Sequence, residues 1–138
     1  MHALFLAGLI LPFAVILAMI VLFSRTMKAF VAEVPVMRTA EDLARFKRLA
    51  ARSMYGALVQ IVLFLVPWAV YVYGLSKQVL LQGEISVIFV LSVATFLFSL
   101  FIKKDEEAAR SLPVEGIELR VERDKVVKTW MQKMWPDW

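Results

Sequence analysis

The chain has 138 residues, of which 61% are hydrophobic, and it carries a formal net charge of +4. A soluble domain of this size could not hide so much apolar surface in one core, so the composition indicates a membrane protein. Because the chain contains no cysteine, disulfides, thiolate metal sites and cysteine nucleophiles are excluded.

The first predicted element is a transmembrane helix over residues 1–23, which include a long uncharged run that begins at Ala3. A cleaved signal peptide would need a basic start and a small-residue cleavage site, and neither is present. The alanines Ala7, Ala14 and Ala18 recur at helical spacing. We expect this small face to contact another helix or another subunit.

Residues 24–53 form a basic segment, which we predict to be a cytoplasmic loop because short positively charged loops stay inside. Thr39 and Asp42 approximate a capping box, so we expect an amphipathic helix to begin near Ala40 and to run on into the next span. One stripe of that helix carries Arg45, Arg48 and Arg52. This stripe either faces lipid headgroups or an acidic partner, or it only anchors the loop inside.

Residues 54–104 read as a transmembrane helical hairpin, because two apolar runs are joined by the short linker 76–84. At ~1.5 Å per residue, each run is long enough to cross a hydrocarbon core of ~30 Å. Gln60 should form a hydrogen bond with another helix. The hydroxyls of Ser92, Thr95 and Ser99 share one helix face, and we expect that face to pack against a helix rather than to line a hydrated pore.

Residues 105–138 form a charged cytoplasmic tail. We expect the third helix to continue until Pro113 stops it. The alternation over 117–122 then favours a short strand, with a helix as the alternative. An amphipathic helix should follow from Asp124, its N-cap, to Trp135. The residues expected to face a partner or the membrane surface are Trp130, Met134 and Trp135.

The sequence offers no catalytic constellation. His2 is the only histidine, and one histidine is too few ligands for a metal. No Lys, Arg, Asp or Glu lies within the apolar runs 3–23, 54–75 and 85–102, so the usual marker of an ion or proton pathway is missing. We therefore expect a protein that is not an enzyme, with no cofactor, no bound metal and no nucleic-acid partner.

The predicted fold is an all-α integral membrane protein with three transmembrane helices, the N-terminus outside and the C-terminus inside. A cytoplasmic amphipathic helix and a short mixed tail complete it. We expect a multi-pass protein of the bacterial inner (cytoplasmic) membrane whose partners are lipids and other complex subunits or copies of itself. The predicted function is that of a non-catalytic subunit or scaffold of a larger membrane complex or homo-oligomer.

The alternative function is a self-assembling pore. The three-span topology with an outside N-terminus and a charged tail resembles that of one class of phage holins. This resemblance would imply that copies associate through the face of Ser92, Thr95 and Ser99.

Overall fold

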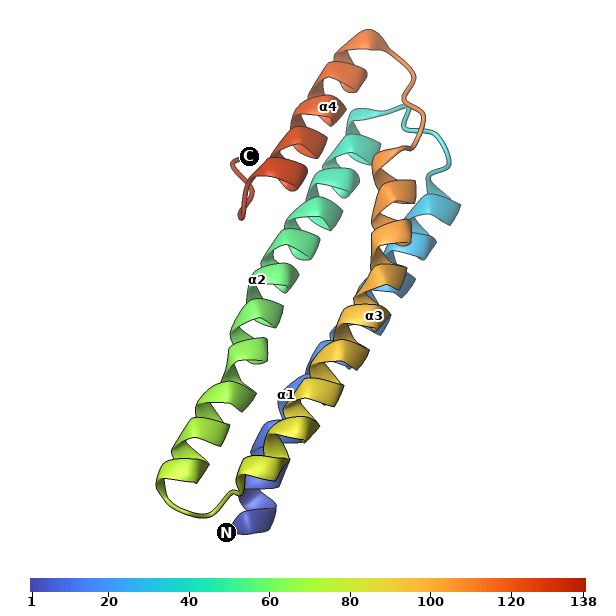
Figure 1. Ribbon diagram of the computed structural model, residues 1–138. Coiled ribbons are helices and arrows are strands. Elements are labelled where there is room, and N and C mark those ends of the chain that lie inside the picture. The colour runs from blue at the N-terminus through green and yellow to red at the C-terminus, as the bar shows by residue number, and fades with distance from the viewer. The chain divides into compact units, whose positions relative to one another are not determined.

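The computed structural model describes residues 1–138 as an all-helical chain (Figure 1). Its elements are α1 (His2–Glu33), α2 (Ala40–Ser76), the short 3₁₀ helix η1 (Gln82–Glu84), α3 (Ile85–Arg110) and α4 (Ile117–Gln132). Three helical segments are long and apolar enough to cross a membrane, with mean hydropathies of 2.9, 2.0 and 2.6. The prediction of three helices able to cross a membrane is therefore confirmed by length and composition, and these helices support a multi-pass membrane protein.

The chain divides into two compact units. One, which we call the apolar unit, contains residues 1–21 and 59–101; the other, the charged unit, contains residues 22–58 and 102–138. All but one of the sixteen Lys and Arg residues belong to the charged unit, the exception being Lys77. The division therefore places nearly all basic side chains in one of the two units.

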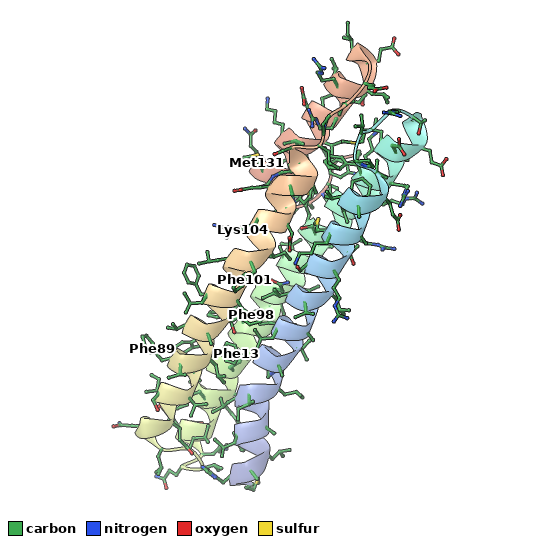
Figure 2. The ribbon with its side chains drawn as sticks, turned by 90° about the vertical axis from the view of Figure 1, so that its right-hand side faces the viewer. Phe13, Phe89, Phe98, Phe101, Lys104 and Met131 are labelled. Atoms are coloured by element: carbon green, nitrogen blue, oxygen red, sulfur yellow. The ribbon has the colours of Figure 1, made fainter.

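The apolar unit is built from the first part of α1, the second part of α2 and most of α3. Its core contains Leu9, Phe13, Tyr71, Leu80 and Ile88. Phe13 meets Phe64 edge to face, with ring centroids 5.9 Å apart. Figure 2 shows Phe89 pointing outward from α3. In this unit, aromatic side chains thus both fill the core and form the outer surface.

Polar contacts hold the linker between α2 and α3 against the rest of the apolar unit. The Tyr71 hydroxyl donates a hydrogen bond to the carbonyl of Gln82 at 3.1 Å, and His2 pairs with Glu84. The linker between the two helices is therefore tied both to α2 and to the beginning of α1.

The charged unit has its own hydrophobic core. That core brings together side chains from all four helices and from the two loops, including Met27, Phe30, Met37, Phe46, Met54, Ala109, Leu112, Val126 and Trp130. In Figure 1, α4 lies beside the beginning of α2. α4 has only 16 residues, and a helix of this length is marginally stable by itself. Packing of its apolar side chains against the other helices therefore holds it in place.

The start of α2 agrees with the sequence prediction. The backbone N–H of Asp42 donates to the Thr39 hydroxyl at 3.2 Å, and the Thr39 N–H donates to the Asp42 carboxylate at 3.3 Å. This reciprocal pair is the predicted capping box. The helix then runs from Ala40 to Ser76 and continues through Pro67. The absence of a breaker between Ala40 and Gly56 had led us to expect one helix from the loop into the span.

The prediction of a strand over 117–122 was wrong, because these residues form the first turns of α4. A helix satisfies its own backbone N–H and C=O groups, whereas a lone strand leaves them unpaired. Of the alternating apolar residues, Leu119 packs against the core while Ile117 and Val121 are exposed.

The predicted N-cap of the last helix was also wrong. Gly116, with a φ of 95°, is the N-cap of α4, and Asp124 lies inside the helix. The helix ends at Gln132, short of the predicted Trp135. The nearest approach to β-structure is a single parallel bridge between Met37 and Val114, which joins the loop before α2 to the loop before α4.

Candidate functional site

The charged unit contains a groove of about 380 Å³, which we call the arginine groove. Its lining comes from the end of α1 and the start of α2: Thr26, Ala29, Phe30, Glu33, Arg45, Arg48, Leu49 and Arg52. All three arginines that the sequence analysis selected therefore open onto one hollow.

The spacing along α2 explains why these arginines meet. Arg45, Arg48 and Arg52 are separated by three and four residues, which places them on one side of a helix. Phe46 and Ala50 project from the opposite side and are fully buried in the core. Burial of that apolar side fixes the rotation of α2 and so turns the arginines toward α1.

The three arginines differ in their surroundings. Arg45 pairs with Glu33 of α1, and its guanidinium lies over the ring of Phe30, 5.8 Å from the centroid. Arg48 and Arg52 are exposed and have no carboxylate within ion-pair distance. With three arginines and one glutamate, the groove has an excess of two positive charges.

The predicted packing residues of α3 divide into two kinds. The Ser92 and Thr95 hydroxyl oxygens are buried and lack a hydrogen-bond partner, whereas Ser99 donates to its own helix, to the Phe96 carbonyl at 2.6 Å. Gln60 of α2 is half-buried. The face of α3 that carries Ser92 and Thr95 is thus turned inward in the apolar unit.

The predicted small face of α1 does not form the core of the apolar unit. Ala7, Ala14 and Ala18 are exposed, and the buried side of α1 consists of larger residues, namely Leu9, Phe13, Ile16 and Ile20. Large side chains fill the space between three helices of this unit more completely than alanines would. A contact of the alanine face with another subunit stays a prediction.

The structure corrects the role expected for Trp130. This side chain is only 8% exposed and belongs to the core of the charged unit, so it is not available to an outside partner. Met134 and Trp135 follow the end of α4, and their exposed fractions are 59% and 60%. Only these two of the three selected tail residues lie on the surface.

Sequence reasoning missed residues that matter for packing and capping. Arg123 donates to the carbonyls of Arg110 and Leu112, at 3.1 and 2.7 Å, and so satisfies groups left free where α3 ends. Gly56 and Gly74 allow side chains to approach the helix backbone closely, those of Phe23 and Leu80 respectively. A glycine within an apolar run was the available signal for such contacts.

These features define an all-helical protein with three helices able to cross a membrane and with an ionic unit that has its own core. The chain matches no protein-family model, no curated protein and no solved structure.

Proposed function

We propose that this protein is a non-catalytic subunit or scaffold of a larger membrane complex or homo-oligomer. The observation that carries the proposal is the low burial of its three candidate spans: only 28%, 17% and 11% of the respective apolar windows are covered by the chain itself. Most of the apolar surface of each span is therefore free to meet lipid or the helices of a partner.

The outer surface of α2 and α3 is suited to such contacts. Its large exposed side chains include Val59, Ile61, Val62, Leu65, Phe89, Val90, Phe96 and Leu97. Helices associate in lipid by close packing and by interhelical hydrogen bonds, since lipid removes the hydrophobic driving force. A second subunit would gain contact with these side chains over the full length of the spans.

Charge supports the orientation that we propose, with the N-terminus outside and the C-terminus inside. The charged unit holds all Lys and Arg residues but Lys77, and basic segments next to spans stay on the cytoplasmic side. We also propose that the membrane is the bacterial inner membrane. There the charged unit would present Met134 and Trp135 to other subunits.

A self-assembling pore is the weaker proposal. The hydroxyl oxygens of Ser92 and Thr95 are enclosed within the single chain, and residues that line a lumen would have to be open to water. Their burial supports a packing role for this face of α3.

The proposal is tested by purifying the tagged full-length chain in mild detergent and measuring its mass and its co-purifying proteins. We expect a stable assembly with at least one other integral membrane protein or with further copies of the chain. A monodisperse monomer without partners would contradict the proposal. In planar bilayers the purified protein should be electrically silent, and stable single-channel currents would favour the pore instead.

A matched pair of variants tests the tail. Replacing the exposed Met134 and Trp135 with serine should reduce the amount of partner protein that co-purifies through the charged unit. Aromatic side chains contribute strongly to the binding energy of protein interfaces. Replacing the exposed Ile117 and Val121 of α4 with serine is the control, since these residues lie near the other end of α4. If both variants recovered the same amount of partner protein, Met134 and Trp135 would not be part of the proposed interface.

A further inference from the structure

We propose that the arginine groove binds the phosphate group of an anionic phospholipid headgroup. The site is formed by Arg48 and Arg52 of α2, with Arg45 held beside them by Glu33. The inference does not depend on the proposed role in a complex, because it concerns only the charged unit and the lipid next to it.

The guanidinium groups provide the recognition chemistry. Each arginine presents a planar set of N–H donors that matches two phosphate oxygens. Arg48 and Arg52 are four residues apart on α2, so their Cβ atoms lie on the same side of the helix, about 5–6 Å apart. Both side chains can therefore reach one phosphate, and neither has to leave a carboxylate to do so.

Glu33 and Phe30 define the third side of the site. Arg45 already pairs with Glu33 and lies over the Phe30 ring, which holds its guanidinium at the wall of the groove. The Glu33 carboxylate repels an incoming phosphate and offsets part of the positive charge. It follows that removing this carboxylate should tighten phosphate binding, whereas removing Arg48 or Arg52 should weaken it.

The position along both helices indicates a lipid rather than a soluble anion. The apolar run of α1 ends at Phe23, and Thr26 lies only ~5 Å further along the helix axis. On α2, Arg52 lies ~3 Å before Met54, where the apolar run begins. Tyr55 is 55% exposed at the same level, and tyrosine favours the membrane interface. The end of the groove formed by Thr26 and Arg52 thus lies close to the level of the headgroup phosphates, and Arg48 lies ~6 Å further along α2 on the aqueous side.

The lining of the groove agrees with this assignment. Ala29 of α1 is exposed and lines the groove, whereas Phe30 and Leu49 line it only with the small part of their side chains that the core leaves uncovered. A lipid can place its glycerol and first methylene groups against these side chains, which adds binding energy that inorganic phosphate cannot gain. An acidic segment of a partner protein could also bind these positive charges, but its binding would not require a site at the bilayer boundary.

The experiment uses the full-length protein in nanodiscs of phosphatidylcholine with increasing fractions of phosphatidylglycerol. Retained lipid is measured by native mass spectrometry. We expect phosphatidylglycerol to be retained by the unmodified protein, and Arg48→Gln with Arg52→Gln to lower its affinity by ~tenfold or more, because charge-assisted hydrogen bonds are lost. Glu33→Gln should raise the affinity.

The control is Arg25→Gln with Lys28→Gln, which removes the same number of positive charges from the end of α1 but outside the groove. An equal loss in this control would show nonspecific attraction to the anionic surface and would overturn the site. The inference would also fail if Glu33→Gln lowered the affinity or if the groove pair had no effect.

The last arm separates the two sources of phosphate. Inorganic phosphate is added at millimolar concentration to the protein in phosphatidylcholine nanodiscs, and thermal stability is recorded. We expect no stabilisation that depends on Arg48 and Arg52. If inorganic phosphate stabilised the protein as much as phosphatidylglycerol does, the groove would be a site for a soluble anion. The proposal of a lipid ligand would then be wrong.

Discussion

The indole ring of Trp130 lies edge-on to the phenyl ring of Phe46, with centroids 5.9 Å apart and ring planes at 60°. The guanidinium of Arg110 also lies over the Trp130 ring, 5.4 Å from the ring centroid. This one side chain of α4 therefore contacts both α2 and α3. It explains how the tail, which the sequence had marked as a surface for partners, becomes part of the charged unit.

Replacing Trp130 with alanine should destabilise the charged unit by about 3–5 kcal/mol, because a large buried aromatic side chain is lost and a cavity remains. Hydrogen exchange of α4 and of the start of α2 measures the effect. Met131→Ala is the control, since Met131 is 66% exposed, and it should change the exchange little. Unchanged protection in Trp130→Ala would show that α4 does not depend on this contact.

Substitution of Gly74 by alanine should destabilise the apolar unit by ~1–3 kcal/mol through overpacking. An added Cβ would lie 2.5 Å from the Leu80 Cδ1 atom, 2.7 Å from its Cγ atom and 3.0 Å from the Phe5 Cδ1 atom. Gly83→Ala is the matched control, because a Cβ there meets nothing within 4 Å. Thermal unfolding in detergent should distinguish the two variants, and equal midpoints would contradict the close contact.

Replacing Thr95 with valine should leave the stability of the apolar unit unchanged or raise it by up to ~1–3 kcal/mol, because a buried hydroxyl without a partner is removed at nearly constant shape. Thr95 is 7% exposed and its hydroxyl has no hydrogen-bond partner. Thr95→Leu should instead be destabilising, since the extra volume has to fit in a closed space. Unfolding in detergent tests both substitutions. A clear loss of stability in Thr95→Val would reveal that the hydroxyl has a partner in the membrane.

Acid should loosen the start of α2. The pKa of the Asp42 carboxyl is lowered from its usual 3.8 because it accepts a hydrogen bond from the Arg38 N–H, with further contributions from Thr39 and Arg45. A lowered folded-state pKa means that the stabilisation is present above pH 3.8 and is lost as the pH falls below it and through the folded-state pKa. Exchange of the Arg38 and Thr39 amides should therefore accelerate relative to the unfolded chain in that range.

Two substitutions isolate this effect. Asp42→Asn should abolish the extra acid sensitivity at the start of α2, because the titrating carboxylate is gone. Glu41→Gln removes the same charge from the same turn but leaves the capping box intact, so its pH dependence should match the unmodified protein. Acid sensitivity that survives in Asp42→Asn would have to come from another group.

The proposed orientation predicts that single cysteines at His2 and Gln82 react with an impermeant maleimide in intact cells, whereas cysteines at Arg45 and Lys128 react only after permeabilisation. The chain has no native cysteine, so each label reports one position. Labelling of the Arg45 position from outside would reverse the proposed topology.

Sequence reasoning was sufficient for the helices that can cross a membrane, for the capping box at Thr39 and Asp42, and for the continuation of α2 from the loop into the span. These are local properties, since the length of an apolar run, a hydrogen bond across one turn and the absence of a breaker before Gly56 depend only on neighbours in the chain. The grouping of Arg45, Arg48 and Arg52 was likewise predictable from helical periodicity.

Which helix faces are buried could not be predicted from the sequence, because burial depends on contacts between helices. The conformation of 117–122 depended on a core into which Leu119 could pack, and the burial of Trp130 depended on Phe46, more than eighty residues earlier in the chain. The arginine groove itself required Glu33 and Phe30 of α1 to lie against α2. An apolar residue on a helix is equally suited to a core, a partner or lipid, and contacts distant in sequence select among these because they determine where water is excluded.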